Sequence, residues 1–152
     1  MGDLPVPHVC GLLNKHRARY VLVGAQASIL HGYVRDTADV DILIPEDLEN
    51  HARVIAALSE LEDHAAAELT PQDFVENVVV KVADEVEVDV STRASKVTYD
   101  EAAPRAERVV IEGVEIIYAD LHTLIASKET YRDQDRVDVA RLRELLRRKS
   151  GS

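Results

Sequence analysis

Cysteine is nearly absent from this sequence, since Cys10 is the only one among 152 residues. A lone cysteine cannot close an intrachain disulfide, which excludes the small secreted domains that disulfides hold together. It also excludes a zinc centre built on several cysteine ligands. We therefore expect a reducing, cytoplasmic environment for this protein.

Long apolar runs are missing as well. No stretch approaches the roughly 18 consecutive apolar residues that a membrane-spanning helix needs. The N-terminus does not carry the basic stretch and apolar run of a secretory signal. These two absences predict a soluble protein without a membrane partner. At the other end, residues 150–152 are expected to be a disordered tail or a remnant of cloning.

Basic side chains are in deficit, because 18 Lys and Arg stand against 28 Asp and Glu and give a net charge of -10. This charge disfavours non-specific attraction to duplex DNA or to an acidic membrane. An RNA partner would therefore have to be held locally. A basic run near the end of the chain suits such a contact, or else it complements a helix C-terminus. Its members are Arg141, Arg143, Arg147, Arg148 and Lys149.

Length and apolar content fit a single domain over residues 1–149, because a chain of 152 residues with 46% hydrophobic content can bury a core. In the first third, helical patterns alternate with short β-rich runs. The pattern predicts a helix at residues 9–17, a buried strand at 20–23, a short helix at 25–33 and a strand at 39–44.

The rest of the chain continues this mixture of helices and strands. Pro45 ends the preceding strand and opens a helix. The predicted core-facing stripe of that helix comprises Leu48, Ala52, Ile55, Leu58 and Leu61. Two antiparallel hairpins are predicted, over residues 74–83 with 86–90 and over residues 108–111 with 114–117. The last third is helical in pattern, with Asp120 as an N-cap and a break near Asp133.

Two acids, Asp39 and Asp41, stand at alternate positions of a predicted strand. Such side chains project from the same face, about 7 Å apart along the chain. Two carboxylates placed in this way repel each other unless a cation lies between them, and their oxygens suit Mg²⁺ or Mn²⁺. The alternative is that both acids simply form the solvent-exposed face of an edge strand.

The order of these features resembles the nucleotidyltransferase superfold. That resemblance rests on a strand, Gly24 and Ala25, a short helix, and then an apolar-flanked pair of acids on the next strand. The superfold carries a third acid on a later strand, and Asp89 between two valines matches it. The resemblance implies a mixed α/β fold of the α+β type, with a β-sheet flanked by helices and further helices at the C-terminus. The alternative for Asp89 is a solvent-facing strand residue beside Glu87.

Finer motifs resemble the minimal and AbiEii-type toxin nucleotidyltransferases. In the first half these motifs are Val23-Gly24-Ala25-x-Ala27, His31-Gly32 and Arg35-x-Thr37-x-Asp39-Val40-Asp41. In the second half they are Leu124-Ile125-Ala126-Ser127-Lys128 and Arg132-Asp133-x-Asp135-x-x-Asp138. Together they span residues 20–142.

The resemblance implies a metal-dependent enzyme that moves NMP from an NTP to a hydroxyl acceptor. The acceptor stays open among an RNA end, a protein and a small molecule, and an antitoxin or a second copy of the chain is an implied partner. Asp39 and Asp41 would bridge Mg²⁺ or Mn²⁺ ions, and Asp89 would ligate the catalytic ion and help to deprotonate the acceptor. The implied nucleotide-binding residues are Gly24, Ala25, Ser28, Arg35, Thr37 and Lys128.

Ala25 departs from the pattern, because many relatives carry Gly or Ser there. Alanine keeps the backbone N–H donor but has neither the hydroxyl of serine nor the freedom of glycine. Ser28, one turn later, is a partial substitute. The departure supports an alternative reading, a catalytically inactive member that binds a nucleotide or a partner. A metal-dependent phosphohydrolase that uses the same acids is a third reading.

Two further residues have competing interpretations. Lys128 either contacts the triphosphate or forms a surface ion pair near Glu129 and Arg132. His31, which precedes Gly32, is expected to be a packed or cap-adjacent residue rather than a catalytic base.

Overall fold

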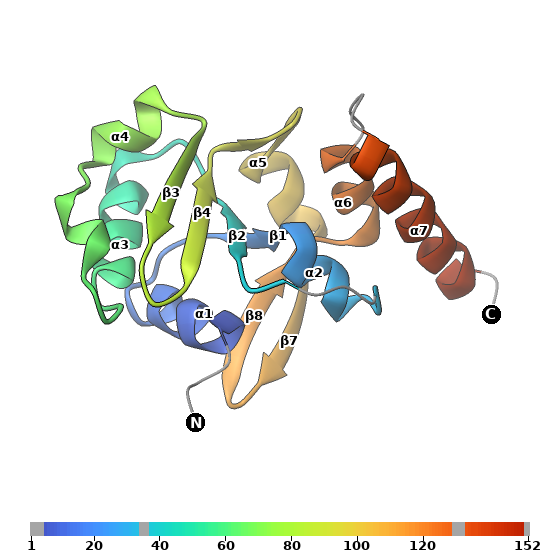
Figure 1. Cartoon of the computed structure of the whole chain (residues 1–152), viewed down its shortest axis with the longest axis horizontal. Helices are drawn as coiled ribbons and strands as arrows, with labels where there is room; N and C mark the ends of the chain where they lie inside the picture. Colours follow the sequence, from blue (N-terminus) through green and yellow to red (C-terminus); the bar gives the residue numbers. More distant parts are fainter. Residues whose placement is uncertain (1–4, 34–36, 129–132, 151–152) are drawn as a thin grey trace.

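One mixed sheet forms the centre of the computed structural model, which describes residues 5–33, 37–128 and 133–150 (Figure 1). Its six strands lie in the order β3-β4-β2-β1-β8-β7. They are β1 (Val21–Val23), β2 (Val40–Leu43), β3 (Val79–Ala83), β4 (Glu87–Ser91), β7 (Glu107–Ile111) and β8 (Val114–Tyr118). The pairs β2–β4 and β1–β8 are parallel, and the other three are antiparallel. The predicted mixed sheet is confirmed.

Helices flank this sheet, as the resemblance implies. Helix α1 (Pro5–Lys15) contacts β8 and α3 (Leu48–Leu58), whereas α2 (Gly24–Leu30) packs on β1 and β2. Helix α6 (Leu121–Ser127) contacts α2 and supports α7 (Asp133–Ser150) at the right of Figure 1. The smaller elements are α4 (Pro71–Glu76), α5 (Tyr99–Ala102), the 3₁₀ turns η1 (Ala65–Glu68) and η2 (Ala103–Arg105), and the hairpin of β5 (Arg93–Ala94) and β6 (Val97–Thr98). Among the described residues, no helix has both the length and the apolar character needed to cross a membrane.

In the central strands β2 and β4, buried apolar side chains alternate with less buried acidic side chains. In β2, Val40 and Ile42 are fully buried while Asp41 between them is half-buried. In β4, Val88 and Val90 are fully buried on either side of Asp89. Because successive side chains of a strand point to opposite faces, the apolar residues enter the core and both acids share the other face.

The first hairpin is shorter than the sequence pattern predicts. The pattern favours a strand from residue 74 onward, but Phe74 lies in α4 and β3 begins later. Pro71 is in the first turn of α4, and the Asp73 carboxylate accepts a hydrogen bond from Thr70 N–H at 2.8 Å. These helix-start signals outweigh the β propensity of the aromatic and β-branched residues that follow.

The buried face of α3 matches the predicted stripe only in part, because Leu58 and Leu61 are fully buried but the stripe residues near the start of the helix are not. Leu48 is 55% exposed and Ala52 is exposed as well. Asn50 is buried instead, because its side chain hydrogen-bonds both the backbone N–H and the carbonyl of Arg19, at 2.7 and 3.0 Å. The predicted stripe is therefore wrong at Leu48 and Ala52. The buried residues of α3 are Asn50, His51, Val54, Ala57 and Leu58.

The second hairpin and the helical C-terminal third are confirmed. Strands β7 and β8 pair antiparallel, and Asp120 caps α6 by accepting a hydrogen bond from Thr123 N–H at 2.9 Å. Helix α6 ends at Ser127 and α7 begins at Asp133, near which the break is predicted, and residues 129–132 lie outside the described residues. Helix α7 includes Ser150, so it extends one residue into the segment predicted as a tail. Residues 151–152 lie outside the described residues.

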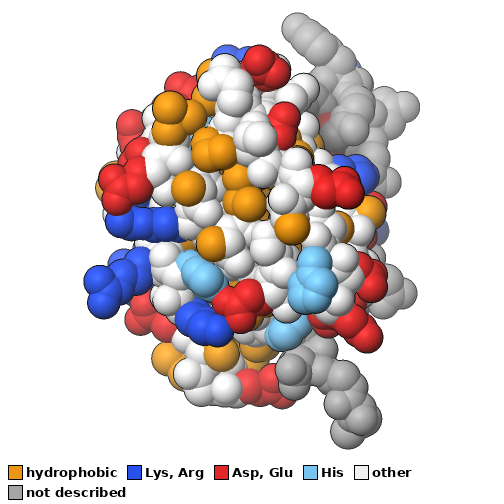
Figure 2. Space-filling view, turned by 90° about the vertical axis from the view of Figure 1, so that its left-hand side faces the viewer, with side chains coloured by type: hydrophobic (Ala, Val, Ile, Leu, Met, Phe, Trp, Pro, Cys, Tyr) orange, Lys and Arg blue, Asp and Glu red, His pale blue; other side chains and the backbone are white. Residues whose placement is uncertain are grey.

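Figure 2 shows the side of the molecule that lies at the left of Figure 1, where α3 and α4 are found. Apolar, acidic, basic and histidine side chains are interspersed on it. Leu48, Val75 and His51 border a small cavity of about 220 Å³ there. The described part of this side lacks the one-sign basic patch that is typical of a nucleic-acid-binding surface.

Candidate active site

Four carboxylates project from one face of the sheet where β2 and β4 lie side by side. The parallel register pairs Asp41 with Asp89, which brings Asp39 level with Glu87. Side chains two residues apart on a strand share a face, so all four acids meet. We call Asp39, Asp41, Glu87 and Asp89 the acid cluster.

Three members of the acid cluster can hold one metal ion together. Asp39, Glu87 and Asp89 each offer a carboxylate oxygen, and these three atoms all lie within 4.8 Å of one another. Oxygen ligands of this kind suit Mg²⁺ and Mn²⁺. Glu87 is the one residue of the acid cluster that the sequence did not predict as a site residue. Its signal was the alternation with Asp89, which puts both acids on one face. The assignment of Asp41 as a further ligand stays a prediction.

Asp41 loses its proton only near neutral pH. Burial raises the pKa of Asp41 to about 7, and the hydrogen bond with Asp89 and the negative charges of Asp89 and Asp39 act in the same direction. The positive charge of Lys128 acts against them. Full ionisation of the acid cluster is therefore costly unless a cation offsets the repulsion.

One oxygen of Asp89 supports a cation site directly. Asp89 Oδ1 is buried and accepts no hydrogen bond from any residue that the structure describes. Lys81 Nζ lies 3.8 Å from it, close enough for an ion pair but too far for a hydrogen bond. A buried carboxylate oxygen without a donor is costly. The donor set and this oxygen together fit a divalent cation held by Asp39, Glu87 and Asp89.

The backbone of Gly24 lies directly against Asp41. Gly24 follows β1 and has a φ of +69°, a conformation that L side chains rarely adopt. A Cβ atom at this position would overlap Asp41 Oδ2 and lie 2.9 Å from Cγ. Two separate features therefore require glycine at position 24: the positive φ, and the close approach of the backbone to the acid cluster. Ala25, next in the chain, is buried.

A model of a known protein family matches most of this chain. The model described as "Nucleotidyltransferase of unknown function (DUF6036)" matches residues 10–147. The chain belongs to this nucleotidyltransferase family. A comparison with curated proteins gave no match. The matched segment contains Gly24 and the whole acid cluster, and the resemblance to nucleotidyltransferases is confirmed at this level. The minimal or AbiEii type stays a prediction.

Three predicted nucleotide-binding residues of this nucleotidyltransferase lie close to Gly24 in the sequence. Ser28 is 2% exposed, and its hydroxyl donates to the Gly24 carbonyl at 3.1 Å. Thr37 Oγ1 accepts a hydrogen bond from Asp39 N–H at 3.3 Å, which helps to position the first acid. Arg35 lies outside the described residues. Phosphate contacts of all three stay predictions.

Lys128 is held by α7 in the nucleotidyltransferase. Its Nζ donates to Asp138 Oδ2 at 2.9 Å and lies 4.0 Å from Asp135 Oδ1. Asp138 also accepts a 2.6 Å hydrogen bond from the Tyr33 hydroxyl. The sequence suggested neither acid as the lysine's partner, although their i, i+3 spacing puts both on one helix face. Glu129 and Arg132 lie outside the residues whose structure is described.

His31 is a packed residue, as expected from the sequence. Lys149 Nζ donates to Nδ1 at 2.9 Å, so Nε2 carries the hydrogen and donates to the Ala119 carbonyl at 2.8 Å. Both ring nitrogens are used, and the side chain is fully buried. The basic run near the chain end is partly neutralised, because Arg147 and Arg148 pair with Glu144.

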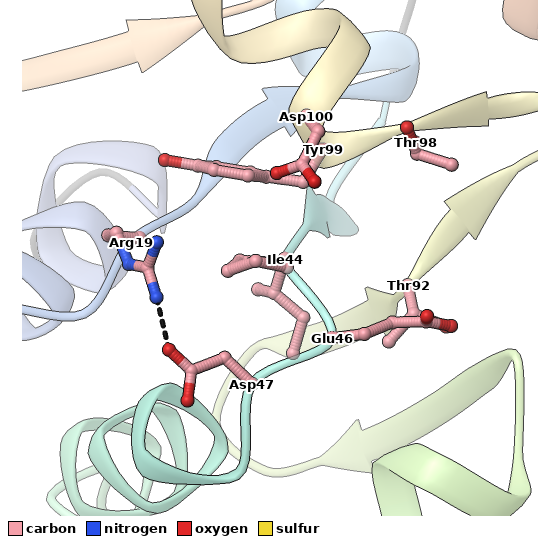
Figure 3. A pocket seen from close by; sticks show the side chains of 9 residues that line it. Arg19, Ile44, Glu46, Asp47, Thr92, Thr98, Tyr99 and Asp100 are labelled. Atoms are coloured by element: carbon pink, nitrogen blue, oxygen red, sulfur yellow. Dashed lines mark hydrogen bonds and ion pairs between the residues drawn. The ribbon is translucent and has the colours of Figure 1, made fainter.

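A cavity of about 400 Å³ lies away from the acid cluster (Figure 3). It borders Ile44, which follows the end of β2, whereas Asp39 precedes the start of that strand. Arg19 and Asp47 form an ion pair across it. None of the predicted site residues lines it. The candidate active site is therefore assigned from the carboxylates of the acid cluster and not from the size of a cavity.

Proposed function

We propose that this nucleotidyltransferase moves a nucleoside monophosphate from an NTP to a hydroxyl acceptor, with Mg²⁺ or Mn²⁺ bound at the acid cluster. The observation that carries the proposal is the meeting of four carboxylates beside Gly24, with Asp89 Oδ1 left without a hydrogen-bond donor. Transfer reactions of this kind depend mainly on positioning and on charge neutralisation. A divalent cation held by the acid cluster would supply both.

The reaction forms a bond between the acceptor oxygen and the α-phosphorus and breaks the bond to pyrophosphate. A divalent cation at Asp39, Glu87 and Asp89 would neutralise charge on the transferred group. Asp89, whose Oδ1 has no hydrogen-bond donor among the described residues, would hold this cation and, as the resemblance implies, help to deprotonate the acceptor hydroxyl. Asp41 lies between Asp89 and the Gly24 backbone, where its carboxylate would bridge the bound cations together with Asp39.

The acceptor stays open among an RNA end, a protein and a small molecule. The likeness of the motifs to minimal and AbiEii-type toxin nucleotidyltransferases supports an antitoxin or a second copy of the chain as partner. We place the protein in the cytoplasm because a lone cysteine suits a reducing environment, and we treat residues 1–149 as one functional domain because their length and apolar content fit a single core.

A catalytically inactive, nucleotide-binding member is the second candidate. Ala25 offers no hydroxyl to a phosphate, and the Ser28 hydroxyl is already bonded to the Gly24 carbonyl. This candidate predicts nucleotide binding without any transfer.

An assay with labelled nucleotides separates these functions. The protein is incubated with each of the four α-³²P-labelled NTPs, Mg²⁺ or Mn²⁺, and either total RNA or cell lysate. We expect label to appear on an acceptor with α-labelled but not with γ-labelled NTP, and EDTA to abolish it. Binding without labelling would favour the inactive member. Release of inorganic phosphate without an adduct would instead favour a phosphohydrolase.

Replacement of Lys128 by alanine is expected to weaken NTP binding by roughly 10- to 100-fold, with little effect on NMP binding, because one charged hydrogen bond to a phosphate is worth about 1.5–3 kcal/mol. Calorimetric titration with NTP and NMP measures both affinities. Lys15→Ala is the matched control, since Lys15 is an exposed lysine that pairs with Glu60. Equal NTP affinity in the Lys128 variant and in this control would remove Lys128 from the nucleotide site.

A further inference from the structure

A lysine of the chain lies where a metal would bind. Lys81 stands opposite Asp89 in the antiparallel pairing of β3 and β4. Its Nζ donates to Glu87 Oε2 at 3.3 Å and lies 3.8 Å from Asp89 Oδ1. Glu87 and Asp89 are two of the three acids whose oxygens come within 4.8 Å of one another. The lysine ammonium and a metal ion therefore draw on the same carboxylates.

We propose that Lys81 is a built-in counter-ion that competes with the divalent cation for Glu87 and Asp89 and thereby sets the metal affinity of the site. This inference rests on the proposed metal site. Two cations cannot share the same carboxylate oxygens without strong repulsion. Metal entry consequently displaces the ammonium of Lys81 from the acid cluster.

The surroundings of Lys81 allow this displacement. Its side chain is 58% exposed and belongs to β3, which is an edge strand of the sheet. An exposed ion pair is weak, so the side chain leaves its partners at little cost. Removal of Lys81 from the acids also does not leave it buried without a partner, because water can solvate the ammonium.

Lys128 provides the contrast. Its side chain is only 17% exposed, and its partner Asp138 is 1% exposed. A lysine held in this way has a fixed position, because breaking a buried ion pair is costly. Of the two lysines whose charges act on the acid cluster, Lys128 is therefore fixed and Lys81 can be displaced. Lys81 responds to the metal, and Lys128 does not.

The test measures Mn²⁺ affinity by calorimetry without nucleotide, at pH 8 and low salt so that surface charges are not screened. We expect Lys81→Met to bind Mn²⁺ about 3- to 10-fold more tightly than the parent, since one repelling charge near the ion is removed. Lys81→Arg keeps the charge and should bind like the parent. Lys15→Met is the matched control, because Lys15 is 63% exposed and pairs with Glu60 at 2.8 Å. It should leave the affinity unchanged.

Each outcome is decisive. Unchanged or weaker Mn²⁺ binding in Lys81→Met overturns the competition and leaves the metal site standing. Equal tightening in the Lys15 control overturns it too, because net charge alone would then explain the effect. Mn²⁺ binding by Lys81→Met but not by the parent supports it. If neither the parent nor any variant binds Mn²⁺, the metal site fails together with the inference. Circular dichroism of each variant confirms that it is folded.

Discussion

Asp89→Asn is expected to reduce nucleotidyl transfer by about 10³-fold while the protein stays folded. The amide cannot take up the acceptor proton and offers a metal only one neutral oxygen. Because Asp89 is the main charge that raises the pKa of Asp41, its neutralisation relieves repulsion in the metal-free protein. The variant should therefore melt at the same temperature as the parent, or higher, in EDTA.

The melting response to metal separates this effect from unfolding. For the parent, Mn²⁺ at 100 times its Kd should stabilise the fold by about 2.7 kcal/mol, which is roughly 5–10 °C in Tm for a chain of this size. Asp89→Asn should lose most of that shift. Asp63→Asn is the control, since Asp63 is an exposed aspartate outside the acid cluster. An Asp89 variant with the parent's Mn²⁺ response would contradict the metal assignment.

Gly24→Ala is expected to lower transfer by about 10²- to 10³-fold and to destabilise the protein by about 2–4 kcal/mol. Two costs combine here, the positive φ of +69° and the overlap of the new Cβ with the Asp41 carboxylate. The carboxylate must move, and the acid cluster moves with it. Thermal melting and the labelled-NTP assay measure the two effects.

Two variants separate backbone strain from the clash with Asp41. Gly113 has a φ of +78° and open space around it, so Gly113→Ala has the strain alone and should keep full activity. In a Gly24→Ala background, Asp41→Ala should restore part of the lost stability without restoring transfer, which is the non-additivity expected of residues in contact. If Gly24→Ala matches Gly113→Ala in both measurements, the close approach has no functional role.

Much of the local structure follows from the sequence because its signals act between near neighbours. The alternation around Asp41 and around Asp89 predicts that apolar residues enter the core while the acids share a face. Asp120 marks the start of α6, and this prediction is confirmed by its hydrogen bond with Thr123. Helix α4 was predictable too, because Thr70 and Pro71 followed by Asp73 form a helix-start signal.

Spacing within a few residues was enough to predict the helices and strands of the first third, the second hairpin and the pairs of acids on each strand, and the resemblance implied the mixed α/β class. Helices α4 and α5 and the hairpin of β5 and β6 were not predicted. Only the tertiary structure decided which strands are neighbours. The parallel register of β2 and β4 joins Asp41 to Asp89, and the pairing of β3 with β4 brings Lys81 to the same place. The partner of Lys128, Asp138 on α7, was decided in the same way. Contacts of this kind join residues far apart in the chain, and they form only when the whole core packs, so no local pattern encodes them.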